Sequence, residues 1–426
     1  MIERALELAM RKAQGAEISM SNSHSLSASY SDNKLKQANV AQAANIWVKV
    51  IVNGKLGRAN TTNPEELEGV VERALALAEF GNEVTFDYPA PAPAQAVKMR
   101  DSQLEATSLE ELVAIGGQMM EAVLAYNPEI KVGAWANRAL YDWRMVNSRG
   151  MDIRQPASDY SIGVGGLLIR GNDMLSAGYG RSWRRKELDP DKCSEQVIKL
   201  FKWAERNVPI APKVMPVIFL PQACYVLLMP LQLGINGKNV LKGESPLADR
   251  IGEKTFSAKF SLTDDGLVDY APGSSPYDWE GTPRRRLEIV KDGVLNSFIY
   301  DLETAAKAGT TSTGHGPGCS TSNLIISPGD TSLEEMIKST PEGLLIESVM
   351  GMGQSNIRNG DFSVNVALGY KIENGEIVGR VKDTMIAGNI YETLKEIDTI
   401  SSDAEWFGST YAPPIKLTGL SVVAKE

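Results

Sequence analysis

The amino-acid sequence predicts an α+β protein in two parts. We expect an N-terminal domain of helices and antiparallel sheet, and a C-terminal domain dominated by antiparallel, barrel-like strands with few helices. Three observations support this fold class. Apolar residues alternate with other residues over long stretches, tight-turn pairs such as Asn53-Gly54 and Asn374-Gly375 join such stretches, and helix-like segments are grouped. Grouped helices beside antiparallel strands argue against a parallel βαβ fold.

In the first half of the chain, the order helix, strands, helix is predicted twice, as an internal duplication would produce. Asn63 can cap a helix that has Pro64 at its first position, and Ser108 forms a capping box with Glu111. The expected helices are residues 2–13, a segment from 63 onward, 108–126 and 194–207. The expected strands are 17–59 with its hairpin turn, 130–140, 143–155 and 159–180, with turns at 148–150 and 171–173.

A proline- and alanine-rich stretch near residues 86–97 predicts an extended linker inside the first half. Four prolines between residues 209 and 221 mark the crossing to the second half. We therefore expect domains at 1–210 and 211–426. The expected strands of the second half are 287–290, 294–300, 344–349, 362–372 and 377–381, and its expected helices are 221–233, 302–308, 333–339 and 390–396.

Composition excludes several classes of protein. The net charge of -9 disfavours a nucleic-acid partner, because such binding depends on cationic side chains that release counterions. Three widely spaced cysteines fit a reducing compartment without a disulfide framework. The N-terminus lacks the apolar region of a signal peptide, and no apolar stretch approaches the roughly 20 residues that span a bilayer. We expect a cytoplasmic protein with no membrane contact.

No metal site is evident in the sequence. The chain has two histidines, His24 and His315, whereas a zinc site needs three or four His, Cys or carboxylate ligands. His24 lies in a polar run and reads as a solvated strand residue. Cys319 follows His315 by four residues, but in a loop rich in glycine and proline. We therefore expect no metal and no other cofactor.

The most unusual segment is the loop Gly314-His315-Gly316-Pro317-Gly318. Its glycines permit backbone conformations closed to other residues, which could let a ligand approach the main chain or could simply turn a corner. The loop lacks the Gly-Lys-Ser/Thr ending of a phosphate loop. The run of arginines at 284–286 reads as a solvated strand end, since successive side chains point to alternating faces.

Several segments of the second half carry a resemblance to a known family. An acidic turn, Asp278-Trp279-Glu280-Gly281, precedes the hairpin turn Lys291-Asp292-Gly293 and the loop Ser312-Thr313-Gly314-His315. Further on, Gly360-Asp361-Phe362-Ser363 precedes Glu373-Asn374-Gly375-Glu376-Ile377. From about residue 216 to its end, the chain resembles the C-terminal domain of the TldD/PmbA family, whose members were once called modulators of DNA gyrase.

The resemblance implies a cytoplasmic two-domain protein, often dimeric, that is connected with peptide hydrolysis. The catalytic branch of the family carries His-Glu-x-x-x-His on a helix, and a cysteine near the C-terminus completes its zinc site. In this sequence Met229 and Gly234 stand at the histidine positions, Pro230 at the glutamate position and Phe407 at the cysteine position. A thioether is a poor zinc ligand and a phenyl ring is none. The chain therefore resembles the PmbA branch, which lacks the zinc motif.

The leading hypothesis is a non-catalytic subunit that pairs with a zinc-bearing TldD-like protein to degrade unfolded or small peptides. Open strand edges could hold a peptide by β-addition, which uses main-chain hydrogen bonds. The candidate walls of the peptide chamber are the turn and the loop that contain Asp278, Glu280, Gly281, Gly314, His315, Gly316 and Gly318.

Two alternatives from other classes stay open. The chain could be a homodimeric peptide-binding or regulatory protein of the gyrase-modulator type, which captures peptides without cleaving them. It could also be an autonomous peptidase with a non-standard site, for example His315 with a nearby serine or aspartate, although no base–nucleophile pair is visible in the sequence.

Overall fold

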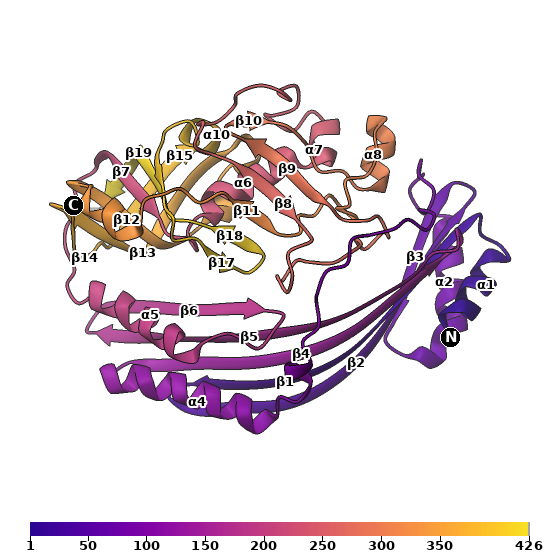
Figure 1. The fold of residues 1–426 in the computed structure, drawn as a ribbon, viewed down its shortest axis with the longest axis horizontal. Helices are drawn as coiled ribbons and strands as arrows, with labels where there is room; N and C mark the ends of the chain where they lie inside the picture. The colour runs from indigo at the N-terminus through magenta and orange to yellow at the C-terminus, as the bar shows by residue number, and fades with distance from the viewer. Residues whose placement is uncertain (425–426) are drawn as a thin grey trace.

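The computed structural model describes residues 1–424 and has the α+β architecture predicted from the sequence (Figure 1). A long curved sheet from the first half of the chain lies beneath a β-rich second half. The sheet is antiparallel and six-stranded, in the order β3-β2-β1-β4-β5-β6. Its strands are β1 (Gly15–Ser31), β2 (Lys34–Val52), β3 (Lys55–Thr61), β4 (Lys131–Asn147), β5 (Asp152–Arg170) and β6 (Asp173–Trp183).

The helices of the first half pack at the two ends of this sheet. At one end, α1 and α2 bury small and branched residues such as Ala5, Val70 and Ala74 against β1 and β2. At the other end, α4 and α5 bury a second core that includes Met119 and Phe201. These helical segments are α1 (Ile2–Met10), η1 (Pro64–Glu66), α2 (Leu67–Ala78), α3 (Ser102–Glu105), α4 (Leu109–Tyr126) and α5 (Pro190–Trp203).

The second half contains two sheets around one large core. The first has the order β10-β9-β8-β11-β18-β17. The second runs β12-β7-β19-β15-β13-β14, and pairing of β12 with β13 closes five of these strands into a barrel. The strands are β7 (Lys213–Phe219), β8 (Leu262–Asp265), β9 (Arg286–Lys291), β10 (Val294–Leu295), β11 (Leu324–Ile326), β12 (Glu342–Met350), β13 (Asp361–Glu373), β14 (Glu376–Arg380), β15 (Thr384–Asn389), β16 (Ile397–Ile400), β17 (Glu405–Phe407), β18 (Thr410–Ala412) and β19 (Ile415–Ala424).

The most apolar helix of the second half, α6, lies inside this core. Because Val226, Leu227, Leu231 and Ile235 cover several faces of α6, the helix is buried rather than amphipathic. The helical segments here are α6 (Tyr225–Ile235), α7 (Gly237–Leu241), α8 (Leu302–Ala308), α9 (Leu333–Lys338), η2 (Met352–Gln354), η3 (Ile357–Asn359) and α10 (Ile390–Thr393). Within residues 1–424, no helix combines the length and the apolar character needed to cross a membrane.

Turns and helix caps that were predicted from the local sequence are present in the structure. Asn53 and Gly54 both have positive φ, 49° and 75°, as a type I′ hairpin requires. Ser108 caps α4, since its side chain accepts a hydrogen bond from the Glu111 N–H. Gly309, with φ 66°, ends α8 in the left-handed conformation.

The predicted strands 130–140, 143–155 and 159–180 were divided wrongly. β4 and β5 continue without a break through these limits, and only the turns near 148–150 and 171–172 lie where the sequence placed them. The second of the predicted breaks contains Pro156, which lies opposite Asp142 and beyond the last β5–β6 pair at Tyr160–Trp183. Edge positions tolerate proline because one side of the strand needs no ladder donor.

Some predicted ends were also wrong. α5 begins earlier than predicted, at Pro190, because the Asp189 side chain caps it through the Asp191 N–H. The predicted strand 294–300 is only Val294–Leu295, and the predicted helix 390–396 ends at Thr393. The first sheet uses residues up to Trp183 and the other two begin at Lys213, so we propose a domain division near residue 210.

Candidate functional site

The first candidate site is a groove along β6, which we name the β6 cavity. Its volume is about 570 Å³, and residues 176–182 form one wall. Within residues 1–424, β6 pairs only with β5 and is the edge strand of its sheet. The outward N–H and C=O groups of an edge strand are available to another extended chain. The cavity therefore opens onto unpaired main chain.

The side chains of β6 leave this main chain accessible. Ala177 is buried in the core, whereas Gly178 is exposed toward the cavity and has no side chain. At Gly180 a Cβ atom would lie 2.5 Å from the Trp135 ring, so only glycine fits beside that indole. Trp135 itself is 38% exposed and lines the cavity. The groove thus combines an open strand edge with an aromatic surface.

The opposite wall of the β6 cavity carries acidic and aromatic side chains. Glu347 of β12 is 8% exposed, and burial raises its pKa to about 7 although Arg181 opposes the shift. Arg181 pairs with Glu405, which also accepts a hydrogen bond from the Tyr179 hydroxyl at 3.0 Å. Phe407 closes this side of the groove. Glu347 was not singled out from the sequence, since an isolated glutamate in a strand carries no signal of its burial.

A second cavity of about 550 Å³, which we name the arginine cavity, lies beside the candidate chamber loops. It is lined by Arg184, Arg284 and Trp279, and by Ser409 of the turn between β17 and β18. Trp279 is 56% exposed, and its ring packs edge-on against Trp143 at 5.1 Å between centroids. Because Gly408 lines the β6 cavity, this turn separates the two cavities.

The structure brings the two predicted chamber loops into contact. The Asp278 carboxylate accepts hydrogen bonds from the main-chain N–H groups of Glu280, Thr282 and Gly316, at 2.9, 2.8 and 2.7 Å. Glu280 accepts from the Leu302 N–H at 3.0 Å, and burial raises its pKa to about 8. Asp278 and Glu280 are 1% and 8% exposed, so their hydrogen bonds stabilise the loops in the protein interior.

Glycine is needed in the two loops for two different reasons, the backbone conformation and the space available for a Cβ atom. Gly281, Gly314 and Gly318 all have positive φ, from 80° to 83°. Gly316 leaves room for Glu280, since a Cβ atom there would lie 2.0 Å from Oε2 of that carboxylate. The loop at 314–318 is thus tightly turned, and its main chain contacts the buried side chain of Glu280.

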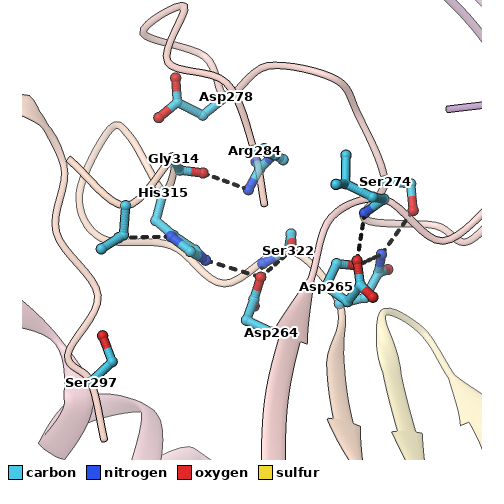
Figure 2. Close-up of polar contacts among 12 residues, drawn as sticks. Asp264, Asp265, Ser274, Asp278, Arg284, Ser297, Gly314, His315 and Ser322 are labelled. Carbon is cyan, nitrogen blue, oxygen red and sulfur yellow. Dashed lines mark hydrogen bonds and ion pairs between the residues drawn. The ribbon is translucent and has the colours of Figure 1, made fainter. Parts of the chain in front are cut away.

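His315 lies in a buried hydrogen-bond network (Figure 2). Its Nε2 is 2.9 Å from Oδ1 of Asp264, and its Nδ1 is 2.9 Å from the Thr313 hydroxyl. A carboxylate accepts hydrogen bonds, so Nε2 carries the proton and Nδ1 can accept from Thr313. Asp264 also accepts from the N–H and hydroxyl of Ser322. This order of residues resembles a catalytic triad in its connections.

Burial argues against catalysis by this network. Thr313, His315 and Asp264 are 4%, 1% and 0% exposed. The Thr313 hydroxyl is also 3.0 Å from the Tyr300 carbonyl and accepts from the Tyr300 N–H at 2.8 Å. A nucleophile must reach the substrate, and Thr313 is enclosed on all these sides. The network stabilises the loop that carries His315.

The positions that the resemblance assigns to zinc ligands do not fit a metal. Met229 is 38% exposed on α6, whereas Pro230 and Gly234 are buried. A Cβ atom at Gly234 would lie 2.4 Å from the Tyr391 hydroxyl oxygen, so that space is filled. Phe407 lines the β6 cavity, which Met229 does not line. In residues 1–424, no three His, Cys, Asp or Glu side chains are grouped as metal ligands.

Two interpretations of single residues were wrong. Arg284 is not part of a solvated strand end: its Nε donates to the Ser275 hydroxyl at 2.9 Å and its Nη1 to the Gly314 carbonyl at 3.0 Å. Only the next two arginines are exposed. His24 is half-buried, and its Nδ1 lies 2.8 Å from the guanidinium of Arg138. Both contacts join segments far apart in sequence, which strand periodicity cannot reveal.

Comparison with known proteins gives the same family for both halves of the chain. Residues 212–424 match the model described as PmbA/TldA metallopeptidase C-terminal domain, and residues 16–78 match PmbA/TldA metallopeptidase domain 1. Metalloprotease PmbA of Escherichia coli O157:H7 is 26% identical over 98% of this chain and 95% of its own length. An uncharacterised protein of Methanocaldococcus jannaschii is 27% identical over 98% of this chain and 99% of its own length.

Solved structures share the whole fold. TldE of Thermococcus kodakarensis superposes with a TM-score of 0.92 at 24% identity, covering 99% of this chain and 100% of that one. A Thermotoga maritima protein described as a modulator of a DNA gyrase superposes with a TM-score of 0.91 at 25% identity, covering 99% of each chain. The architecture around both cavities therefore belongs to a fold already known in other organisms.

Proposed function

The chain belongs to the PmbA/TldD family, and from this premise we propose that it is a non-catalytic subunit of a peptide-degrading complex. In this role it pairs with a zinc-bearing TldD-like protein, and the two chains enclose a chamber in which unfolded or small peptides are hydrolysed. The partner supplies the metal chemistry. This chain supplies the wall that holds the peptide.

The observation that carries the proposal is the chemistry of the zinc positions. Met229, Pro230 and Phe407 offer no imidazole, carboxylate or thiolate, and Gly234 is packed against Tyr391. Zinc in proteins is bound by nitrogen, oxygen and thiolate ligands. A chain that has the family fold but lacks zinc ligands at these positions is suited to the role of a non-catalytic subunit.

The β6 cavity suits the holding of varied peptides. A peptide laid along β6 would add a seventh strand to the six-stranded sheet and use main-chain hydrogen bonds, which do not depend on its sequence. Gly178 has no side chain to cover the main chain of β6, whereas the Gly180 carbonyl accepts a hydrogen bond from Arg181 Nη1 at 2.9 Å. The candidate chamber loops at 278–281 and 314–318 support the neighbouring arginine cavity in the same proposal.

The decisive experiment measures association and zinc content together. The purified chain is mixed with the TldD-like protein of the same organism and analysed by size-exclusion chromatography, and zinc is measured by inductively coupled plasma mass spectrometry. We expect a stable complex whose zinc follows the TldD-like chain, and sub-stoichiometric zinc in this chain alone. One zinc per isolated chain, or no association, would refute the proposal. A homodimer that binds peptides without the partner would favour the gyrase-modulator alternative.

Filling the groove is expected to abolish peptide capture while the fold is kept. In Gly178→Trp, the new Cβ atom would meet no atom closer than 3.6 Å, and we expect the indole to fill part of the β6 cavity, which Gly178 lines. We expect binding of a fluorescent unfolded peptide to the complex to weaken about tenfold or more. Met174→Trp is the matched control, because Met174 is 60% exposed on the same strand outside the cavity. Equal binding by both variants would exclude β6 as the peptide site.

A further inference from the structure

The arginine cavity has the features of a binding site for an anionic group. It lies where the two halves of the chain meet: Arg184 follows β6 and Arg284 precedes β9. Burial lowers the pKa of Arg184; the carboxylate of Asp159 opposes this shift and the charge of Arg284 adds to it. Two like charges in a desolvated cavity are costly unless an anion joins them.

Neither arginine is saturated by the protein. Arg184 donates from Nη2 to the Pro272 carbonyl at 2.7 Å, and within residues 1–424 its buried Nε makes no hydrogen bond, although it lies 3.8 Å from Oδ1 of Asp159. Arg284 uses Nε and Nη1 for the Ser275 hydroxyl and the Gly314 carbonyl. Figure 2 shows the Arg284 side chain beside the Gly314 carbonyl, with Ser322 and Ser274 on two other segments nearby. Each guanidinium has five N–H donors, so both keep donors for a ligand.

The nearby carboxylates offset part of the charge of the two arginines: Asp159 opposes the lowering of the pKa of Arg184, and Asp278 and Asp264 oppose that of Arg284, which burial lowers. Asp264 accepts from His315 and from both donors of Ser322, and Asp278 accepts three main-chain N–H groups. Asp159 is 3.8 Å from Arg184, and its pKa is raised by desolvation even though Arg184 opposes the shift. Of the charged side chains, Arg184, Arg284 and Asp159 line the cavity itself.

The rest of the lining indicates what kind of anion would fit. Gln155 is 7% exposed, and its Oε1 has no hydrogen-bond partner in residues 1–424, so an acceptor for an N–H group is left over. Trp143 and Trp279 add apolar ring surface. Asp159 disfavours a doubly charged phosphate more than a singly charged carboxylate. An amide N–H beside a carboxylate is the chemistry of a peptide end.

We propose that the arginine cavity binds a carboxylate of the peptide substrate, with Arg184 and Arg284 as its cationic ligands. The inference rests on the proposed function, since it names the part of the peptide that this subunit recognises. Guanidinium groups bind carboxylates through paired, charge-assisted hydrogen bonds. A carboxylate seated there would join the two halves of the chain and anchor one end of a peptide that runs on toward β6.

The ligand-side test uses three acetylated tripeptides and isothermal titration calorimetry with the full chain. One has a free C-terminal carboxylate and alanine side chains, the second is its C-terminal amide, and the third is an amide with a central glutamate. We expect the free acid to bind about tenfold or more tightly than the neutral amide. The third peptide distinguishes the two sources of a carboxylate: tight binding assigns the site to acidic side chains, and weak binding assigns it to the C-terminus.

The protein-side test uses Arg184→Gln and Arg284→Gln. Each is expected to remove the preference for the free acid, with affinity for the neutral amide unchanged. Arg185→Gln and Arg285→Gln are matched controls, because these neighbouring arginines are exposed and do not line the cavity. Thermal unfolding of every variant separates lost binding from lost folding.

The outcomes separate this inference from the proposed function. Equal affinity of the wild-type chain for the acid and the neutral amide, or no binding of either, would overturn the carboxylate site. Association with the TldD-like partner is measured independently and tests only the subunit role. If Arg284→Gln fails to fold, the comparison of acid and amide on the wild-type chain still decides the matter.

Discussion

Replacing Asp264 with alanine is expected to lower the free energy of unfolding by about 3–5 kcal/mol, because three buried donors lose their acceptor. Asp264 is 0% exposed and accepts hydrogen bonds from His315 Nε2 and from the N–H and hydroxyl of Ser322. In Asp264→Ala these donors stay buried without an acceptor, and each unsatisfied group costs about 1–3 kcal/mol. Denaturant-induced unfolding, followed by circular dichroism, measures the change.

The matched control is Asp265→Ala, one residue further along the chain. The Asp265 side chain is less buried and accepts a hydrogen bond from the Leu267 N–H at 2.9 Å. We expect this variant to lose about 1 kcal/mol, as for one ordinary hydrogen bond. If the two variants were equally stable, the network around His315 would not be what holds the loop at 314–318.

Raising the pH from 5 to 8.5 is expected to destabilise the protein through two buried glutamates. Burial raises the pKa of Glu280 from 4.5 to about 8 and that of Glu347 from 4.5 to about 7. Between pH 4.5 and these folded-state pKa values, the two glutamates are protonated in the folded chain and ionised in the unfolded chain. Unfolding there releases a proton, so stability is full below pH 4.5 and falls as the pH rises through the folded-state pKa. The shifts correspond to about 3–5 kcal/mol for each group.

Glutamine variants test this pH dependence directly. Glu280→Gln and Glu347→Gln remove the ionisation and keep the shape, and the new amide oxygen at position 280 can still accept from the Leu302 N–H. We expect each variant to exceed the wild type in stability at pH 8.5 and the double variant to have the flattest profile. Glu303→Gln, at an exposed position of α8, should leave the profile unchanged. A wild-type profile that is flat from pH 5 to 8.5 would contradict the assignment.

The hairpins and caps followed from local sequence, because their physical cause is local. Asn53-Gly54 takes positive φ at little cost, and the Ser108 hydroxyl reaches a main-chain N–H three residues away. The limits of β4 and β5 did not follow, since strands of this length are held by their neighbours in the sheet. Pro156 shows the difference: its local signal is a break, and its place beyond the end of β6 makes it harmless.

The candidate site, too, has features that the sequence could predict and features that it could not. The identity of Met229, Pro230 and Phe407 was enough to predict that the zinc positions are degenerate, since ligand chemistry belongs to the side chain itself. That Gly234 is filled by Tyr391 could not be predicted, because the two residues are 157 positions apart in the chain. The same holds for Arg284, which the arginine run suggested to be solvated.

By itself, the sequence determined the α+β class, the turn positions and the family resemblance, and from that resemblance it predicts that the zinc-ligating side chains are missing. These follow from periodicity, from backbone preference and from the chemistry of single residues. Only the tertiary structure decided which groups meet: Arg184 and Arg284 share one cavity, Glu347 shares another with β6, and His315 is hydrogen-bonded to Asp264. Burial and electrostatics act through space, and the contacts that set them join residues that sequence order keeps apart.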